Sequence, residues 1–134
     1  MRTHRMQYRV PYADTDQMGV VYYANYLVYF ERSRTEMLRD AGAPYSKLEA
    51  DGLILPVSEA YCKYISPAHY DELLTLTSTV EEIKGVRLKI ASEVWHGETL
   101  LAKGYVVLAC VNRDGKLIKP SPALTAACGD TRQE

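Results

Sequence analysis

Several residue types on which other small proteins depend are scarce in this chain of 134 residues. It has one phenylalanine and one tryptophan, and no apolar run is long enough to cross a membrane. The three cysteines (Cys62, Cys110 and Cys128) are odd in number and widely spaced, so we expect reduced thiols in a cytoplasmic protein rather than a disulfide framework. The amino-terminal residues lack the hydrophobic segment of a signal peptide.

An excess of one charge is also missing, since 16 Lys and Arg balance 17 Asp and Glu. We therefore expect neither nucleic acid nor an anionic membrane as a partner. The histidines show no metal-ligand spacing, and no G-x-S-x-G motif supplies a serine nucleophile. A D-x-D-x-x-G string is similar to a calcium loop, but Met18 occupies a ligand position and Asn25 the place of the closing glutamate. We expect no metal.

The chain length and the residue periods predict a single α+β domain spanning residues 1–134. Residues 5–12 alternate as a half-buried strand, with Met6, Tyr8, Val10 and Tyr12 on one face. Residues 23–41 have a helical period, and Gly42 suits the carboxyl end of that helix. Asn25 is an alternative cap that would start the helix later. The apolar face of the helix comprises Tyr23, Tyr26, Leu27, Phe30, Met37, Leu38 and Ala41.

Four further runs predict strands, at residues 53–65, 72–83, 86–95 and 100–112. Residues 43–52 are a turn or a short helix, and we expect poor order from about residue 121. Short turns between long strands favour an antiparallel meander. A helix with one broad apolar face needs a sheet to cover it, so we expect five antiparallel strands wrapped around the helix.

The most informative stretch is the carboxylate-bearing loop ahead of the helix. Asp14 and Asp16 precede a helix N-terminus, where backbone N–H groups lack partners and the dipole is positive. One interpretation is a local Asx-type turn, with Gly19 supplying an unusual backbone conformation. The other is a nucleophile or base beside an oxyanion hole. Asp14 fits a structural role better.

Residues 10–36 carry a resemblance to a known family, V-P-Y-A-D-T-D-Q-M-G-V-V-Y-Y-A-N-Y-L-V-Y-F-E-R-S-R-T-E. This run resembles the signature of the 4-hydroxybenzoyl-CoA thioesterase type of hotdog-fold acyl-CoA thioesterases, in particular the Tol-Pal-associated branch. Residues 61–72, Y-C-K-Y-I-S-P-A-H-Y-D-E, are similar to a later passage of that family. The resemblance implies a hotdog fold, a homodimer or homotetramer with sites between subunits, and hydrolysis of acyl thioesters of coenzyme A or acyl carrier protein without a separate cofactor.

Carried across by position, the resemblance assigns Asp16 as the catalytic aspartate and places Gly19 and Val20 in the tight loop after it. The backbone N–H of Tyr23, in the first helical turn, would polarise the thioester carbonyl. Two positions depart from the family. Pro11 stands where many members have arginine, and Tyr23 replaces a common histidine, which puts any side-chain role at that position in doubt.

Other candidate substrate contacts have alternatives of equal or greater weight. The focal tyrosines, including Tyr22 and Tyr26, either line an acyl tunnel with Asn25 or pack in the core and interfaces. Glu31 is a second acid or base, or the partner of Arg34, which lies inside the apolar stripe. Cys62 suits a small core residue. Three cations could bind the phosphates of coenzyme A: Lys84, Arg87 and Lys89. The alternative is that they form a solvated strand face.

The sequence therefore predicts an acyl-CoA thioesterase with Asp16 as nucleophile or general base. A non-catalytic acyl-thioester-binding or scaffold protein is the main alternative. A hotdog dehydratase or hydratase would want a histidine in the focal loop, which has none. A cystatin-like isomerase fold generally begins with helices, whereas a strand comes first here.

Overall fold

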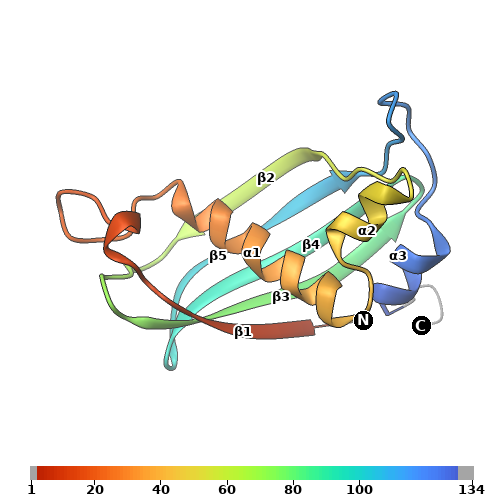
Figure 1. Cartoon of the computed structure of the whole chain (residues 1–134). Helices are drawn as coiled ribbons and strands as arrows, with labels where there is room; N and C mark the ends of the chain where they lie inside the picture. The colour runs from red at the N-terminus through yellow and green to blue at the C-terminus, as the bar shows by residue number, and fades with distance from the viewer. Residues whose placement is uncertain (1–2, 130–134) are drawn as a thin grey trace.

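A computed structural model describes residues 3–129. Its strands are β1 (Thr3–Arg9), β2 (Val57–Tyr64), β3 (Leu73–Lys84), β4 (Arg87–His96) and β5 (Thr99–Ala109). Its helices are α1 (Asn25–Asp40), α2 (Tyr45–Ala50) and α3 (Pro122–Ala127), with one 3₁₀ turn, η1 (Tyr12–Asp14). The strands form one curved sheet whose inner face holds α1, which confirms the α+β prediction (Figure 1).

The sheet has the order β1-β3-β4-β5-β2, and every neighbouring pair is antiparallel. The predicted meander is right for β3, β4 and β5. It is wrong for β2, which pairs with β5 at one edge although β3 follows it in the chain. Ser66 and Pro67 do not make a hairpin, because the link from β2 leads across the end of the sheet to its other side (Figure 1).

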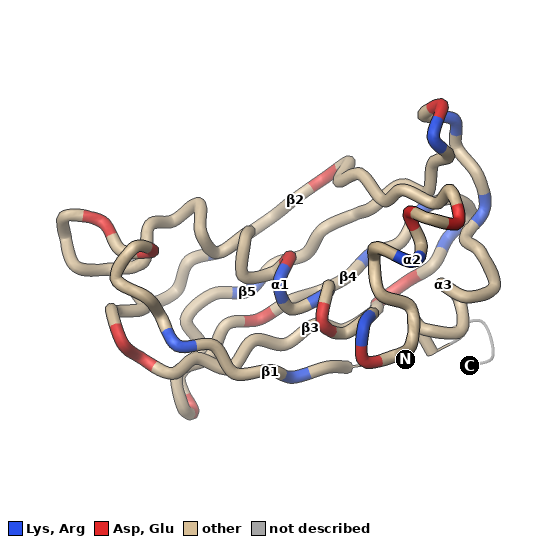
Figure 2. The backbone as a smooth tube through the Cα atoms, in the orientation of Figure 1, with Lys and Arg blue, Asp and Glu red and all other residues tan. Residues whose placement is uncertain are grey.

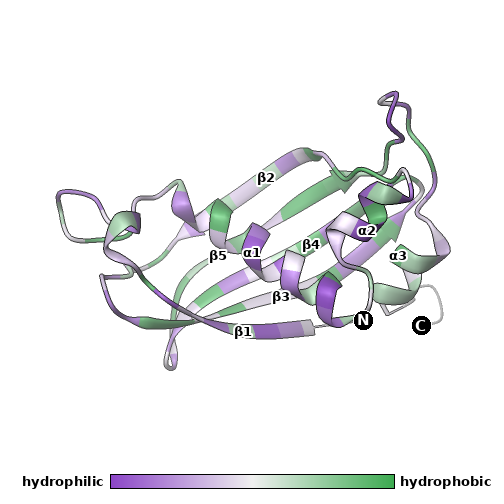
Figure 3. Ribbon diagram, viewed as in Figure 1, coloured by the Kyte–Doolittle hydropathy of each residue, from purple (hydrophilic) through white to green (hydrophobic). Residues whose placement is uncertain are grey.

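The inner face of the sheet follows from alternation in β3 and β4. Leu74, Leu76 and Val80 of β3 are buried, as are Leu88, Ile90 and Val94 of β4, and hydrophobic and hydrophilic residues are interspersed along the strands (Figure 3). On β5, a Cβ at Gly104 would lie 2.9 Å from Cε2 of Phe30 and would overlap the carbonyl of Tyr61. Glycine there lets α1 and β2 both approach β5 closely.

Helix α1 begins two residues later than the sequence pattern predicted. Tyr23 and Leu27 are consequently off the buried face, with exposed fractions of 62% and 39%. Tyr29, which the pattern missed, is completely buried. Asn25 does not cap the helix, since its side-chain amide donates to the carbonyl of Asp14 instead.

Three strand boundaries also differ from the prediction. Strand β1 ends at Arg9, and Tyr12 lies in the 3₁₀ turn after Pro11 with 76% of its surface exposed. Strand β2 begins only at Val57, while Ile54 makes an isolated bridge to Val111. Strand β5 ends at Ala109 rather than at residue 112.

Helix α3 lies where the sequence suggested poor order. The hydroxyl of Ser121 accepts a hydrogen bond of 3.3 Å from the N–H of Leu124, and proline occupies the first turn, which together cap a helix. Leu124 and Cys128 are fully buried against the core. The part of that expectation that concerns residues 130–134 lies outside the described residues.

The interior consists of two apolar clusters at opposite ends of α1. The site-end cluster includes Val21, Tyr26 and Tyr29 beneath the start of α1. The far-end cluster includes Met37, Leu38 and Leu124 and contains residues from α3.

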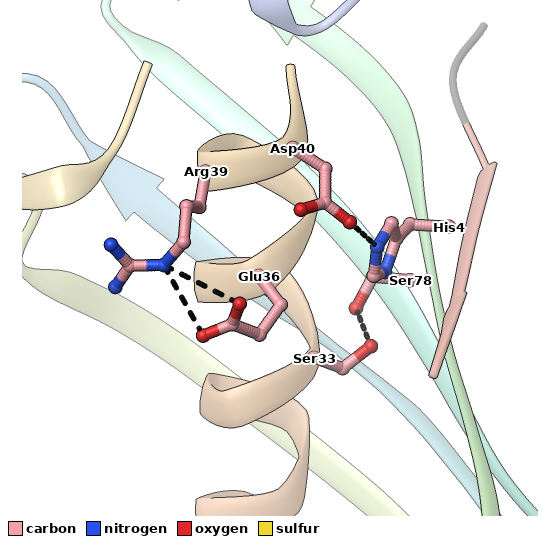
Figure 4. A network of polar contacts seen from close by, with 6 residues as sticks. All are labelled: His4, Ser33, Glu36, Arg39, Asp40 and Ser78. Carbon is pink, nitrogen blue, oxygen red and sulfur yellow. Dashed lines mark hydrogen bonds and ion pairs between the residues drawn. The ribbon is translucent and has the colours of Figure 1, made fainter. Parts of the chain in front are cut away.

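Three buried serines, Ser33, Ser78 and Ser92, lie close together between these two clusters. Ser78 donates a hydrogen bond of 2.7 Å to the hydroxyl of Ser33, and its oxygen lies 3.1 Å from that of Ser92. On β3, Ser78 separates Leu76 of the site-end cluster from Val80 of the far-end cluster. Figure 4 shows the Ser33–Ser78 contact beside two ion pairs of α1, Arg39 with Glu36 at 3.4 Å and Asp40 with His4 at 2.7 Å.

Candidate active site

The loop between η1 and α1 closes on itself. Thr15 and Val21 form an antiparallel bridge, so Asp16 lies opposite Val20 and its N–H donates to the Val20 carbonyl at 2.9 Å. The N–H of Gly19 donates to the carbonyl of Asp16 at 3.0 Å. Gly19 has a φ of +80°, which a residue with a side chain rarely adopts. The loop is therefore tight and hydrogen-bonded at the position of the acid; acidic positions ahead of α1 are red in Figure 2.

The carboxylate of Asp16 is half-buried and is held at one of its oxygens. Its Oδ1 accepts a hydrogen bond of 2.8 Å from the N–H of Met18. Among residues 3–129 no protein group hydrogen-bonds to its Oδ2. The Asx-type turn and the nucleophile are therefore compatible interpretations, because the turn fixes one oxygen and leaves the other available to a ligand.

Tyr23 lies in a turn just ahead of α1, not in its first helical turn as the resemblance implied. The turn is closed by hydrogen bonds from the N–H of Asn25 to the Tyr22 carbonyl at 2.9 Å and from the N–H of Tyr26 to the Tyr23 carbonyl at 3.3 Å. Within the described part of the chain, the N–H of Tyr23 has no hydrogen-bond acceptor. It is free to donate to a bound oxygen.

A depression of about 270 Å³ adjoins this turn, and uncharged residues line it: Val21, Tyr23, Tyr26, Tyr64, Ile65, Ser66 and Pro67. Burial raises the pKa of Tyr26, and burial followed by the nearby Cys62 raises the pKa of Tyr64 to about 12. Both phenols are therefore neutral near pH 7. Tyr23 is among the lining residues and Asp16 is not.

Asp14 makes contacts only within the protein. Its Oδ2 accepts hydrogen bonds from the hydroxyls of Tyr8 at 3.0 Å and Tyr29 at 2.8 Å. Its carbonyl accepts from the N–H of Tyr22 and from the side chain of Asn25, both at 2.9 Å. These contacts agree with the structural role that the sequence favoured for this residue.

Four of the predicted substrate contacts are engaged in protein contacts beside the loop. The Tyr22 ring packs on that of Tyr23 with centroids 4.7 Å apart, and the Asn25 side chain is held by Asp14. Tyr26 is 3% exposed, and its hydroxyl accepts from the N–H of Ala68 at 3.2 Å. The Val20 backbone forms a bridge to His69. The structure thus brings these residues together around Asp16 largely as scaffolding.

The remaining predicted contacts lie away from Asp16. Glu31 is about 9 Å along α1 from its first residue. The side chain of Glu31 lies 3.8 Å from that of the mostly buried Arg34. Burial lowers the pKa of Arg34, and Glu31 opposes that effect. The pairing of these two residues is therefore the interpretation that the structure supports.

The three cations are at the opposite end of the sheet. Lys84 is the last residue of β3, about 35 Å along that strand from Leu73 beside the loop. Lys89 lies 3.8 Å from Glu81 and 4.4 Å from the centre of the Tyr105 ring. With Lys84 and Arg87 it lines a small hollow of about 120 Å³ that also contains Glu82. The fold of the chain therefore does not place these cations beside Asp16.

Larger depressions exist, but they lie along other parts of α1. One of about 460 Å³ runs between α1 and β2 and includes Arg34, and one of about 570 Å³ borders β1 and includes His4. We place the site at the smaller depression because Tyr23 lines it and lines neither of the two larger ones. Residues 3–129 hold no cluster of side chains suited to a metal ion, and none of their helices could span a membrane.

Residues that the sequence did not suggest also contribute to this site. Tyr64, from the end of β2, donates a hydrogen bond to the Tyr23 carbonyl, and Tyr8 and Tyr29 hold Asp14. No local pattern could have indicated these contacts, because each joins residues from different elements. Only the five-tyrosine concentration in residues 12–29 hinted that phenols matter here.

Comparisons with known proteins give several similar sequences and structures. The chain is 39% identical over 87 residues to the Bacillus subtilis protein YneP, a match that spans 63% of that protein. It is 35% identical over 109 residues to the acyl-CoA thioester hydrolase YbgC of Escherichia coli, covering 81% of each chain. A Bartonella henselae structure described as a probable thioesterase superposes with a TM-score of 0.85 at 37% identity, over 90% of this chain and 100% of that one.

A family-level match covers most of the described residues. Residues 10–128 match the thioesterase-like superfamily, and that span includes the loop with Asp16, α1, the strands β2–β5 and α3. The sheet wrapped around one long helix has the expected hotdog architecture. This chain therefore belongs to the thioesterase-like superfamily of hotdog-fold proteins.

Proposed function

We propose that this protein hydrolyses acyl thioesters of coenzyme A, with Asp16 as the reacting carboxylate and the Tyr23 N–H as the oxyanion donor. The observation that carries the proposal is that, among residues 3–129, one carboxylate oxygen of Asp16 and the N–H of Tyr23, which lies two residues after the loop closed by Thr15 and Val21, are both left unengaged by protein groups. Membership of the thioesterase-like superfamily and the likeness to YbgC support the substrate class.

The chemistry needs a nucleophile and a stabilised oxyanion. Oδ2 of Asp16 either attacks the thioester carbonyl, giving a mixed anhydride that water then hydrolyses, or takes a proton from the water that attacks. In both routes the C–S bond breaks, the sulfur leaves with its electron pair and is protonated, and the acid is released. The Tyr23 N–H would hold the negative oxygen, and such a donor is typically worth about 10²–10³ in rate. Coenzyme A enters only as part of the substrate.

The uncharged, tyrosine-rich depression beside Tyr23 suits an acyl group without a charge. Acyl carrier protein is the alternative carrier, since the depression contacts only the acyl end of either substrate. In either substrate the thioester carbonyl would accept a hydrogen bond from the Tyr23 N–H, and the acyl chain would lie against Tyr64. A panel of acyl thioesters of both carriers distinguishes the two.

We also propose that the working form is a homodimer or homotetramer. Strand β2 is an edge strand with an unpaired side, and the apolar Leu27, Val28 and Val57 are exposed along it and on α1. A second copy placed there would enclose the open side of the site. It would also be the source of any contact from Glu31, Lys84, Arg87 or Lys89 to the substrate.

The test compares the wild-type protein with Asp16→Asn in assays of free-thiol release from short, long and aromatic acyl-CoAs. We expect the wild type to turn over at least one of them and Asp16→Asn to lose about 10³-fold or more of that rate. Asp51→Asn, which alters an exposed carboxylate after α2, is the matched control. Undiminished activity in Asp16→Asn would overturn the assignment. Tight acyl-CoA binding without turnover by the wild type would identify a binding protein instead.

A further inference from the structure

We infer that Asp14 is the positioning residue of this site: it fixes the position of the Asp16 carboxylate relative to the Tyr23 amide. This inference rests on the proposed function, because it concerns the geometry that hydrolysis by Asp16 requires. We assign Asp14 a role through its neighbours because protein groups engage its Oδ2 and its carbonyl.

The side chain of Asp14 anchors the loop to two elements of the core. Tyr29 lies on the buried face of α1 with no exposed surface, and Tyr8 lies on the inner face of β1. Both hydroxyls donate to the same oxygen, Oδ2, and the two rings pack with centroids 5.0 Å apart. A carboxylate oxygen that accepts two phenols cannot move without breaking a charge-assisted hydrogen bond.

The main chain of Asp14 anchors the other half of the site. Its carbonyl receives the N–H of Tyr22 and the side-chain amide of Asn25, which flank Tyr23 in sequence. Asp16 follows two positions after Asp14 in the same loop. One residue therefore fixes the distance between the acid and the amide, which otherwise belong to a surface loop and a turn.

The electrostatics of this anchor are stable near neutral pH. Burial, and then the hydrogen bond and charge of Asp14, raise the pKa of both Tyr29 and Tyr8 above the ordinary value of 10.0. The phenols therefore remain protonated donors. The guanidinium of Arg32 lies over the Tyr8 ring at 5.2 Å and places a positive charge on the exposed side of the anchor.

The experiment removes either the tyrosine donors or the charge of Asp14 and leaves Asp16 unchanged. We expect Tyr29→Phe and Asp14→Asn each to lower kcat by about 10- to 100-fold, with KM changed less than about threefold, because small displacements of reacting groups cost rate rather than affinity. Tyr8→Phe, which is only partly buried, should lower kcat in the same direction and is the variant least exposed to misfolding.

Tyr45→Phe is the matched control. The Tyr45 hydroxyl also makes one part-buried hydrogen bond, accepting from the N–H of Leu55 at 2.9 Å, but it lies beside α2 at the far end of the molecule. We expect Tyr45→Phe to lower the midpoint of thermal unfolding as much as Tyr8→Phe does and to leave kcat unchanged. Equal kcat losses in the two variants would reduce Asp14 to a purely structural residue.

A double-variant cycle separates this inference from the proposed function. In an Asp16→Asn background, Tyr29→Phe should change the residual rate less than about twofold, since no positioned acid remains to be displaced. Asp16→Asn with full activity refutes the proposed function. Asp16→Asn without activity, together with Tyr8→Phe and Tyr29→Phe at wild-type kcat, refutes the role of Asp14 alone.

Discussion

The hydroxyl of Tyr64 donates a hydrogen bond of 3.0 Å to the main-chain carbonyl of Tyr23. This contact joins the end of the edge strand β2 to the turn that carries the proposed oxyanion donor. The Tyr64 ring also meets the rings of Tyr23 and Tyr26 edge-on, with centroids 6.3 Å and 5.2 Å apart. A strand far away in sequence therefore helps to orient the Tyr23 peptide.

Removal of that hydroxyl should weaken catalysis modestly. We expect Tyr64→Phe to lower kcat/KM about fivefold, the effect of losing one neutral hydrogen bond of about 1 kcal/mol. Tyr61→Phe is the control, since Tyr61 lies on the same strand but faces outward and stacks on Tyr105. Steady-state kinetics with one acyl-CoA would check this, and equal values for the wild type and Tyr64→Phe would contradict it.

Gly104→Ala should destabilise the fold strongly. Its new methyl group would overlap the Tyr61 carbonyl on β2 and crowd the Phe30 ring on α1, so a strand or the helix must shift. We expect a loss of at least about 1–3 kcal/mol in the free energy of unfolding, measured by urea denaturation. Lys103→Ala, at the exposed neighbouring position, should stay within about 0.5 kcal/mol of the wild type. A stable Gly104→Ala protein would show that β2 can separate from β5.

The buried serines permit a test of hydrogen-bond pairing. Ser78→Ala leaves the hydroxyls of Ser33 and Ser92 without the partner that joins them, and it should cost about 1–3 kcal/mol of unfolding free energy. Replacement of all three by alanine should cost less than the sum of the single losses, because no polar group then remains buried. Urea denaturation of the four variants measures this, and strict additivity would rule it out.

Ionisation of Tyr29 should lower the stability of the fold at alkaline pH. Burial raises its pKa in the folded state above its unfolded value of about 10, so the stabilisation it provides is fully present below that pH and is lost as the pH rises further. The free energy of unfolding should therefore fall with a shallower slope between about pH 10 and 12 in Tyr29→Phe than in the wild type. Parallel curves for the two proteins would show that the phenol does not contribute.

Much of the architecture follows from local patterns. Alternation fixes the inward set Leu74, Leu76 and Val80, and the helical period finds α1 with Phe30, Met37 and Leu38 on its buried face. The broad apolar face of that helix then requires a sheet to cover it. These features depend on side-chain periods, which a sequence displays directly.

Other features depend on contacts between distant segments, and no local pattern carries them. The place of β2 beside β5 depends on Gly104 making room, and the burial of Tyr29 depends on Asp14 accepting its hydroxyl. The motif located the loop of Asp16, yet the support from Tyr8 and Tyr64 became visible only in three dimensions. Helix α3 is different, since Ser121 and Pro122 are an ordinary helix start, but the residues after them have too little periodicity to indicate a helix.

The three buried serines separate the two apolar clusters, and this separation has a practical consequence for protein engineering. The far-end cluster contains residues of α1 and α3 and shares no residue with the site-end cluster. Thermostabilising substitutions introduced around Leu124 or Leu48 can therefore raise the melting temperature while the reaction centre keeps its shape. The two properties can be optimised in separate libraries.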